Sequence, residues 1–271
     1  MMDVFVRTYN SERYLNQCFL GIEETFGNRI SIVDHHSSDG TLEIAARHGV
    51  RVYFDTEGLA EAIQICCEKA ETEFFAIIDS DVELKAGSWL SKLNCLMREQ
   101  NIGGVGLRMY SEEPLWRQKY CKFWLGVNDF TEIMSGDWVN AYVVRKDAVK
   151  NIKVPIELEA FEHVFLKDYI LRGGYCLAAV ETNCVHHYDF PANKGSWLGA
   201  GARIYNGLRG FSYIILNKFF LSPFKAVPPA LVYRDPTIIF ENANYWFKFL
   251  RGYLQPERYI GLSRKALPCQ K

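Results

Sequence analysis

An apolar run that ends in two carboxylates constrains this chain most. Residues 74–78 read Phe-Phe-Ala-Ile-Ile, and Asp79-Ser80-Asp81 follow without a break. Because the run has no polar alternation, it predicts a parallel strand that is covered on both faces. If the chain stays extended through Ser80, the side chains of Asp79 and Asp81 point the same way, beyond the carboxyl end of the strand. That end is where open α/β sheets hold their ligands.

Two carboxylates directed at one point favour Mg²⁺ or Mn²⁺. These hard cations take oxygen ligands, and substrate phosphates usually complete their coordination. Asp-x-Asp is also a common tripeptide, and an Asp-Ser-Asp turn that only ends a strand fits the same residues. The rest of the chain therefore decides between a metal site and a simple turn.

The first third of the chain alternates strands and helices. Strands are expected at 4–6, 30–34, 50–54 and 74–78, and helices at 11–22, 39–46 and 58–70. This order, with short loops, predicts an α/β fold with a doubly wound parallel sheet. Further strands are expected near 103–109, 140–145 and 175–180, and further helices near 89–97, 115–124 and 157–172. Neither Gly-x-Gly-x-x-Gly nor Gly-Lys-Ser/Thr is present, so a nucleotide would be held in another way.

Composition narrows the class of protein. The chain has 271 residues, 49% of them hydrophobic and 23% charged, as in an ordinary globular protein. A formal net charge of −1 gives no positive field, so no nucleic-acid partner is expected. The eight cysteines follow neither disulfide nor metal spacing, which favours free thiols in the cytoplasm. The first strand begins almost at residue 1, which argues against a signal peptide.

The C-terminal part of the chain has a different character. After about Gly195, aromatic residues mix with Lys, Arg and Pro, so we place a domain boundary near Lys194. Residues 1–194 would then form the main domain, and residues 195–271 a helical, aromatic-rich extension. A helix over 236–253 with aromatic and basic residues fits an interfacial membrane contact, which we favour. A helix that packs on the main domain or on a second subunit of a homo-oligomer fits the same pattern.

Four stretches in order resemble family 2 of the GT-A glycosyltransferases. Val4–Leu15, with Thr8-Tyr9-Asn10, resembles the family's opening, and Ile32–Thr41 resembles its second-strand signature, Val-Asp-Asp-Gly-Ser-x-Asp-Gly-Thr. Ile77–Asp81 resembles the family's Asp-x-Asp, and Glu162-His163, followed by Gly174-Tyr175, resembles its Glu-Asp helix. The resemblance extends over residues 3–190. A sugar-1-phosphate nucleotidyltransferase shares the general fold, but its Gly-rich, basic opening loop is absent here.

The resemblance implies a GT-A fold, which is a Rossmann-like, mostly parallel sheet flanked by helices. It also implies a UDP- or GDP-linked sugar donor, Mn²⁺ or Mg²⁺, and transfer to an acceptor hydroxyl with inversion. By the same resemblance, residues 1–194 would be the catalytic domain. The implied donor-pocket residues are Thr8, Tyr9, Asn10 and Glu12, with Asp34 and Asp39 on the base or ribose or fixing the loops, and Asp79 with Ser80 at the ribose or metal. Asp81 would be the firmer metal ligand.

This reaction explains why such residues are needed. The leaving phosphates need charge stabilisation, which a bound metal supplies as a Lewis acid. A base must take the proton of the acceptor hydroxyl. The pocket must also exclude water, which would otherwise accept the sugar. The acceptor is expected to be a saccharide or a lipid-linked molecule, used in the cytoplasm or at the cytoplasmic face of the membrane.

Two departures from the family pattern lie around the donor. His35-His36 replace Asp-Gly beside the nucleotide pocket, which leaves the base preference open. A shared metal on this pair is disfavoured because adjacent side chains of a strand diverge. Ile63-Gln64 stand where the family carries Arg-Asn. One cationic contact to the donor phosphates is therefore missing, or it is supplied by another residue. The candidates for it are Arg108, Arg117 and Arg203.

A third departure affects the base. His163 stands where the family has its catalytic Asp, and we place the base at Glu162 or His163, with Glu159 as an alternative. An inactive relative would show the same substitution. The alternative function is therefore a non-catalytic nucleotide-sugar binding protein or assembly partner.

The last candidates follow the strand that begins near Tyr175. His186 or His187 would supply a third metal ligand, and an imidazole beside carboxylates suits Mn²⁺. A loop histidine that packs on Tyr188 is the alternative. The sequence does not distinguish between the two histidines.

Overall fold

The structure, a computed structural model, describes residues 2–111, 115, 119–120, 123, 140–158, 161–187, 194–209 and 222–259. The chain divides into two compact units. Unit 1 comprises Met1–Glu112, Met134–Ile156 and Glu162–Tyr188. Unit 2 comprises Glu113–Ile133, Glu157–Phe161 and Asp189–Lys271. The predicted division into residues 1–194 and 195–271 stays a prediction.

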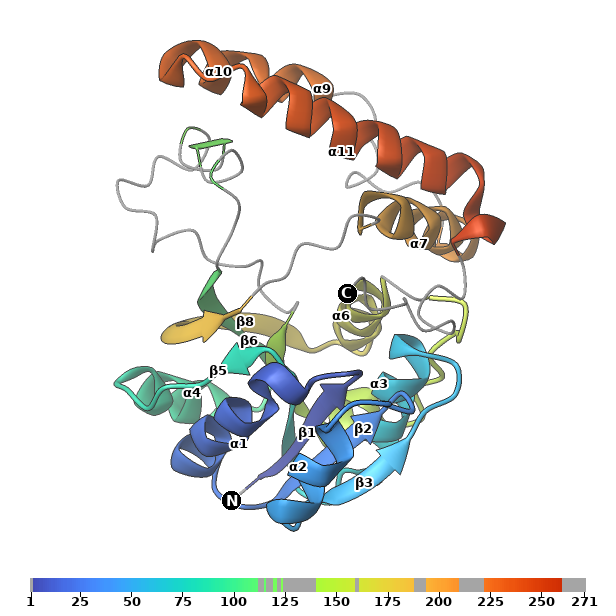
Figure 1. Ribbon diagram of the computed structural model, residues 1–271. Helices are drawn as coiled ribbons and strands as arrows, with labels where there is room; N and C mark the ends of the chain where they lie inside the picture. Colours follow the sequence, from blue (N-terminus) through green and yellow to red (C-terminus); the bar gives the residue numbers. More distant parts are fainter. Residues whose placement is uncertain are drawn as a thin grey trace. The chain divides into compact units, whose positions relative to one another are not determined.

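Unit 1 is built on an eight-stranded mixed sheet with the order β3-β2-β1-β4-β7-β6-β8-β5 (Figure 1). Its strands are β1 (Asp3–Thr8), β2 (Ile30–Asp34), β3 (Arg51–Phe54), β4 (Phe74–Asp79), β5 (Val82–Glu83), β6 (Ile102–Ser111), β7 (Ala141–Arg145) and β8 (Cys176–His186). Strands β1 to β4 run parallel to one another, and β6 runs parallel to β8. Strand β7 pairs in antiparallel fashion with β4 and β6, and β5 pairs in antiparallel fashion with β8. The expected α/β fold with a mostly parallel sheet is confirmed.

Helices cover both faces of this sheet, as continuous apolar strands require. The helices of unit 1 are α1 (Glu12–Phe26), α2 (Thr41–Arg47), α3 (Leu59–Lys69), α4 (Trp89–Arg98) and α6 (Glu162–Arg172), with a 3-10 turn η2 (Lys146–Val149). Val4, Val6 and Ile78 join one core cluster with apolar residues of α1, α2 and α4. Phe5 alternates with Val4 and Val6 and points to the opposite face, where α3 packs against β1 and β2.

The strand register brings three predicted site residues to one edge of the sheet. Thr8 of β1 lies opposite Asp34 of β2, and Arg7 of β1 lies opposite Asp79 of β4. These positions are the carboxyl ends of three neighbouring parallel strands. The central place of β1 in this trio therefore positions the site.

Two expectations about local structure are wrong. The chain does not stay extended through Ser80: β4 ends at Asp79, and Ser80 and Asp81 form a turn into β5. The hydroxyl of Ser80 lies 2.6 Å from that of Ser11, which holds this turn against the start of α1. The helix expected from residue 157 begins at Glu162. The helix expected over 115–124 lies largely outside the described residues.

The described part of unit 2 is helical. It contains α7 (Lys194–Arg209), α9 (Ser222–Lys225), α10 (Val227–Tyr233), α11 (Thr237–Leu254) and a 3-10 turn η4 (Pro256–Arg258). Helices α7 and α11 approach closely at Gly199, where an added Cβ would lie 2.0 Å from the carbonyl oxygen of Phe249. Any side chain at this position would separate the two helices. None of the helices that the structure describes is both long and apolar enough to cross a bilayer.

Candidate active site

The loops after β1 and β2 are tied to each other by short polar side chains. The Thr8 hydroxyl donates to Asp34 Oδ1 at 2.7 Å, and Ser37 donates to both Asp34 oxygens from its backbone N–H and its hydroxyl. Asp34 is completely buried. Asp34 therefore joins the two loops, and a contact of Asp34 with the base or ribose stays a prediction.

Asn10 connects the same two loops a step further out. Its backbone N–H donates to the Ser37 hydroxyl, and its side-chain oxygen accepts the N–H of Ser38 at 2.9 Å. Asn10 has a φ of 47°, in the left-handed region that asparagine tolerates better than most residues. The Thr8-Tyr9-Asn10 turn is therefore held open at the carboxyl edge of the sheet.

Glu12 and Asp39 join the first turns of α1 and α2. The backbone N–H of Glu12 donates to Asp39 Oδ2 at 3.1 Å, and Gly40 donates its N–H to Glu12 Oε2 at 3.1 Å. Asp39 Oδ1 also accepts the N–H of Thr41. Both carboxylates thus satisfy backbone donors at helix starts.

His35 and His36 have different neighbours, and the expected reason for this is wrong: the pair lies beyond the end of β2, and His36 has a φ of 51° rather than an extended backbone. His35 Nδ1 lies 2.6 Å from Oδ1 of the buried Asp55, and the His35 ring meets the Tyr9 ring edge to face. His36 is exposed and stacks on Phe54 with an interplanar angle of 12°. The described residues therefore offer no metal site shared by this pair.

A buried arginine unites two of the predicted carboxylates. Arg7 donates to Asp79 Oδ1 from Nε at 2.9 Å and from Nη2 at 2.5 Å, and to Glu162 Oε1 from Nη1 at 3.1 Å. The side chains of Arg7 and Glu162 are only 6% and 4% exposed. Burial raises the pKa of Asp79, and Arg7 opposes that rise. This network links the end of β4 to the start of α6.

Asp81 contacts a residue of β8, whereas Asp79 contacts Arg7. His186 Nε2 lies 3.1 Å from Asp81 Oδ2, because His186 pairs with Val82 across β5 and β8. Asp81 Oδ1 is buried and has no hydrogen-bond partner in the described residues. Asp81 lies close enough to contribute to the raised pKa of Asp79. The two aspartates thus share a neighbourhood although their side chains make different contacts.

His187 has different neighbours from His186. Its Nε2 lies 3.0 Å from Glu83 Oε2, and its ring stacks on Tyr14 at 5.1 Å with an interplanar angle of 4°. The guanidinium of Arg13 lies over the Tyr14 ring, 4.7 Å from the centroid of that ring. His187 donates its backbone N–H to the carbonyl oxygen of Asp81 at 2.9 Å, but of the two imidazoles only that of His186 meets the Asp81 carboxylate in the described residues.

The chemistry at Asp81 fits a divalent cation. A buried carboxylate oxygen without a donor is costly, and a cation beside it removes that cost. A carboxylate with an imidazole suits Mn²⁺, and carboxylate oxygen alone also suits Mg²⁺. Among the described residues, no group of three or more His, Cys, Asp or Glu side chains could hold a metal by itself. Further ligands would have to come from a bound molecule, as is usual for Mg²⁺ with phosphates.

The two candidate bases lie side by side at the start of α6. His163 Nδ1 is 3.8 Å from Glu162 Oε1, and Glu162 Oε2 is buried without a hydrogen-bond partner in the described residues. Burial alone raises the pKa of Glu162, but His163 and then Arg7 outweigh it and hold this pKa below its usual value. Glu162 is therefore ionised near neutral pH. Glu159 lies outside the described residues.

The remaining cationic candidates that the structure describes have other contacts. Arg108 lies 3.7 Å from Glu181, and Arg203 lies over the ring of Tyr253 within unit 2. Arg117 lies outside the described residues. Ile63 is a core residue of α3, and Gln64 binds the backbone of Ile152 and Val154. These two positions are therefore structural in this chain.

Sequence reasoning missed Arg7, Asp55 and Glu83, which hold Asp79, His35 and His187 respectively. Arg7 had a readable signal, because it interrupts an apolar strand, and a buried charge requires a partner. Asp55 and Glu83 had none, since nothing in the sequence indicates which loops meet.

Crystal structures of glucosyl-3-phosphoglycerate synthase from Mycobacterium tuberculosis are similar to this chain. The complex with Mn²⁺, uridine diphosphate and phosphoglyceric acid has a TM-score of 0.52 and 17% identity, over 74% of each chain. A complex with Mn²⁺, UDP-glucose and phosphoglyceric acid has a TM-score of 0.56 and 13% identity, over 78% of this chain and 80% of that one. At such identities the likeness concerns the fold, and it confirms the GT-A fold.

Sequence comparison identifies the family. No curated protein matches the chain significantly. The profile described as Glycosyl transferase family 2 matches residues 3–152, which is more than half of the chain. The matched segment contains the β1 and β2 loops, the Asp79-Ser80-Asp81 turn and the strands that align them. The chain therefore belongs to glycosyl transferase family 2.

Proposed function

We propose that this glycosyltransferase moves a sugar from a UDP- or GDP-linked donor to an acceptor hydroxyl, with inversion, using Mn²⁺ or Mg²⁺. The observation that carries the proposal is Asp81, whose buried Oδ1 has no hydrogen-bond partner among the described residues while Oδ2 lies 3.1 Å from His186. The similar synthase was crystallised with Mn²⁺ and UDP-glucose, and also with Mg²⁺ and UDP at a TM-score of 0.50 and 14% identity. These complexes support a nucleotide-sugar donor and a divalent metal here.

In this proposal Asp81 and His186 hold the metal, and Asp79 with Ser80 borders the ribose or the metal. The bound ion supplies a Lewis acid for the leaving diphosphate. Arg7 donates two hydrogen bonds to Oδ1 of Asp79 and so fixes this carboxylate at the end of β4. The Thr8-Tyr9-Asn10 turn, fixed to the β2 loop, forms the wall for the nucleotide.

We assign the base to the Glu162-His163 pair, with Glu162 as the first candidate. Glu162 carries a buried oxygen that has no hydrogen-bond partner in the part of the chain that the structure describes, and its lowered pKa keeps it ionised near neutral pH. An ionised carboxylate can accept the proton of the acceptor hydroxyl as the bond to the sugar forms. His163 then orients Glu162 and stabilises its charge.

Asp81→Asn tests the metal end of the site. Thermal unfolding of the wild-type chain should shift upward with a matching nucleotide sugar only when Mn²⁺ or Mg²⁺ is present, since a ligand that binds the native state stabilises it. In Asp81→Asn this metal-dependent shift should disappear, and the rate of nucleoside diphosphate release should fall by about a hundredfold or more. Asp147→Asn, an exposed aspartate on η2, is the matched control.

Two outcomes separate the enzyme from a binding protein. Release of nucleoside diphosphate by the wild-type chain with any acceptor in a pool of saccharides, polyprenyl phosphates and phosphoglycerate supports the transferase. Tight donor binding with no release from any acceptor, under the same metal conditions, would instead support a non-catalytic nucleotide-sugar binding protein.

We also propose a lipid-linked acceptor and peripheral attachment of unit 2 to an anionic membrane surface at its cytoplasmic face. Phe240, Phe247 and Leu254 recur every seven residues on α11 and are 72%, 62% and 67% exposed. Seven residues are close to two helical turns, so the three side chains share one face. Two exposed arginines lie near the C-terminal end of α11: Arg251 in its last turn and Arg258 in η4. Apolar and basic residues on one face fit the boundary between acyl chains and anionic headgroups.

A further inference from the structure

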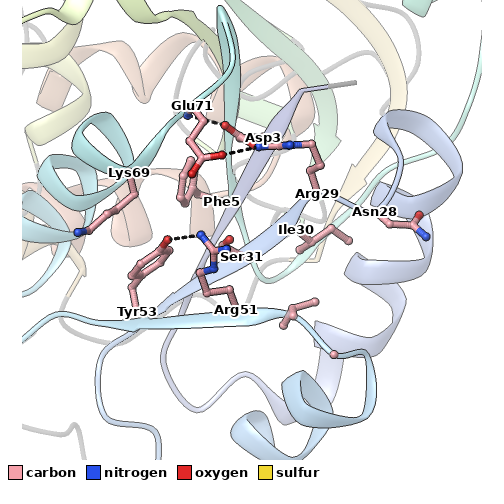
Figure 2. Close-up of a pocket in the computed structure, with 12 residues that line it drawn as sticks. Asp3, Phe5, Asn28, Arg29, Ile30, Ser31, Arg51, Tyr53, Lys69 and Glu71 are labelled. Atoms are coloured by element: carbon pink, nitrogen blue, oxygen red, sulfur yellow. Dashed lines mark hydrogen bonds and ion pairs between the residues drawn. The ribbon is translucent and has the colours of Figure 1, made fainter.

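A cavity lies in unit 1 at the amino ends of β1, β2 and β3. It has a volume of about 390 Å³, and we call it the amino-end pocket (Figure 2). Its lining residues are Asp3, Phe5, Asn28, Arg29, Ile30, Ser31, Gly49, Val50, Arg51, Tyr53, Lys69 and Glu71. Asp3, Ile30 and Arg51 are the first residues of β1, β2 and β3. The candidate active site lies at the carboxyl ends of β1, β2 and β4, so this cavity is separate from it.

The local sequence explains why the sheet is hollow here. Ser31 pairs in register with both Phe5 and Arg51, so a small side chain lies between two large ones on the same face. The helix that covers this face, α3, ends at Lys69. Strand β3 is the edge of the sheet, so no further strand closes that side. Cavities of roughly 300–1,000 Å³ are typical of small-molecule sites.

The two carboxylates of the pocket already have partners. Arg29 Nε donates to Asp3 Oδ1 at 2.6 Å, and Arg29 Nη2 donates to Glu71 Oε2 at 2.9 Å. Asp3 Oδ2 accepts the backbone N–H groups of Glu71 and Thr72. Burial alone raises the pKa of Asp3, but these donors hold it below its usual value. The acidic side of the pocket is therefore ionised and satisfied within the fold.

The basic side of the pocket is different. Arg51 Nη1 donates to the hydroxyl of Tyr53 at 3.1 Å, and Lys69 Nζ lies 5.8 Å from the centroid of the Tyr53 ring. Neither cation forms an ion pair with any residue that the structure describes. The Tyr53 oxygen accepts from Arg51, which leaves the tyrosine's own proton free to donate. Arg51 and Lys69 thus lie beside Tyr53, whose hydroxyl can also donate. With Arg29 they give the pocket three positive charges against the two negative charges of Asp3 and Glu71, an excess of one.

We propose that the amino-end pocket binds a small phosphomonoester, with its phosphate on Arg51, Lys69 and the Tyr53 hydroxyl. A guanidinium and an ammonium are the side chains that bind phosphate oxygens most strongly. Asn28 and Ser31 line the same cavity and provide neutral polar groups for the hydroxyls of the ligand. The site does not depend on the proposed transfer reaction.

Isothermal titration calorimetry of the full chain at physiological ionic strength tests this site, with glycerol 3-phosphate and inorganic phosphate as probes. Saturable binding is expected in the wild type and, unchanged, in Asp81→Asn. The double variant Arg51→Ala/Lys69→Ala should bind at least about tenfold more weakly. Tyr53→Phe should weaken binding severalfold, because it removes one hydroxyl and leaves the charge intact.

The control has the same loss of charge elsewhere on unit 1. Lys92→Ala/Arg98→Ala removes an exposed lysine and an exposed arginine from α4, and binding should stay unchanged. Circular dichroism confirms that each variant is folded. Equal weakening in both double variants would reduce the effect to general surface charge and overturn the proposal. So would the absence of saturable binding in the wild type, or its loss in Asp81→Asn, which would place the phosphate in the active site.

Discussion

Arg7 is a buried cation between two carboxylates from distant parts of the chain. It contacts Asp79 on β4 and Glu162 on α6. One side chain therefore positions both Asp79, which lies near the proposed metal site, and Glu162, which is a candidate base. Desolvation of three charged groups is expensive, and only their mutual contacts offset it. At the scale of single residues, the site therefore depends on a charge balance that no one of them could hold alone.

Arg7→Ala should destabilise the fold strongly. Removing one partner of a buried ion pair costs about 3–5 kcal/mol, because it leaves unpaired charge in the interior. Urea unfolding followed by circular dichroism measures this free energy. Arg172→Ala is the control, since Arg172 is 62% exposed and pairs with Asp168 one helical turn away, an interaction worth less than about 0.5 kcal/mol. Equal losses in the two variants would contradict the role given to Arg7.

His163→Ala should move the pH dependence of the reaction. Burial raises the pKa of Glu162, and His163 is the main group that lowers it, followed by Arg7. Without His163 the pKa of Glu162 rises, so protonation begins at higher pH and the acid limb of the kcat/KM profile shifts upward. Activity well above that limb should be largely retained if Glu162 is the base.

The same profile identifies the base. A large loss of activity at every pH in His163→Ala, with Glu162→Gln less affected, would assign the base to His163. His48→Ala serves as the control for loss of an imidazole, because His48 binds Glu23 and Asn16 away from the carboxyl ends of the strands.

The helices α1 and α2 stabilise each other's first turns. Asp39 accepts the N–H groups of Glu12 and Thr41, and Glu12 accepts the N–H of Gly40. The Ser11 side chain makes no capping bond to α1 and instead meets Ser80. At the scale of elements, Asp39 of the loop after β2 therefore fixes the first turns of α1 and α2, beside the proposed donor pocket.

Asp39→Ala should cost about 1 kcal/mol of stability, as expected for the loss of a helix cap. Donor affinity measured well below the unfolding temperature should change little, because the carboxylate points at backbone donors. Chemical unfolding and donor titration give the two quantities, and Asp147→Ala is the exposed control. A tenfold loss of donor affinity with unchanged stability would show instead that Asp39 contacts the donor.

The molecule has two compact units with different surfaces. Unit 1 carries both strand-end sites, and unit 2 carries the exposed apolar face of α11 with its neighbouring arginines. An exposed apolar face of this kind usually has a partner. At the scale of the whole chain, we assign that partner to an anionic lipid surface.

Phe240→Ser/Phe247→Ser should weaken binding to vesicles that contain anionic lipid by about tenfold or more, since each buried aromatic side chain contributes roughly 1.5–3 kcal/mol. Flotation of the full chain with phosphatidylglycerol vesicles measures this, with phosphatidylcholine vesicles for comparison. Phe54→Ser, an exposed phenylalanine of unit 1, is the matched control. Unchanged flotation, together with a change of oligomeric state in the double variant, would assign the face to a second copy of the chain.

Sequence alone was enough for the βαβ order. The placement of the site at the carboxyl ends of the strands, with Asp34, Asp39, Asp79 and Asp81 as its acidic residues, stays a prediction. These features follow from local periodicity and from motif order, which do not require knowledge of long-range contacts. It was not enough for the path of the chain at Ser80, where contact with Ser11 turns the strand aside.

What only the tertiary structure decided is which charges meet. It brought the imidazole of His186 rather than that of His187 to the Asp81 carboxylate, because β5 pairs with β8 at that register. It joined Arg7 to Glu162 across 155 positions of the sequence. It also exposed the amino-end pocket, whose lining residues come from segments between Asp3 and Glu71. Periodicity reports which face a side chain takes, whereas ion pairs depend on the order and register of strands that the sequence leaves unspecified.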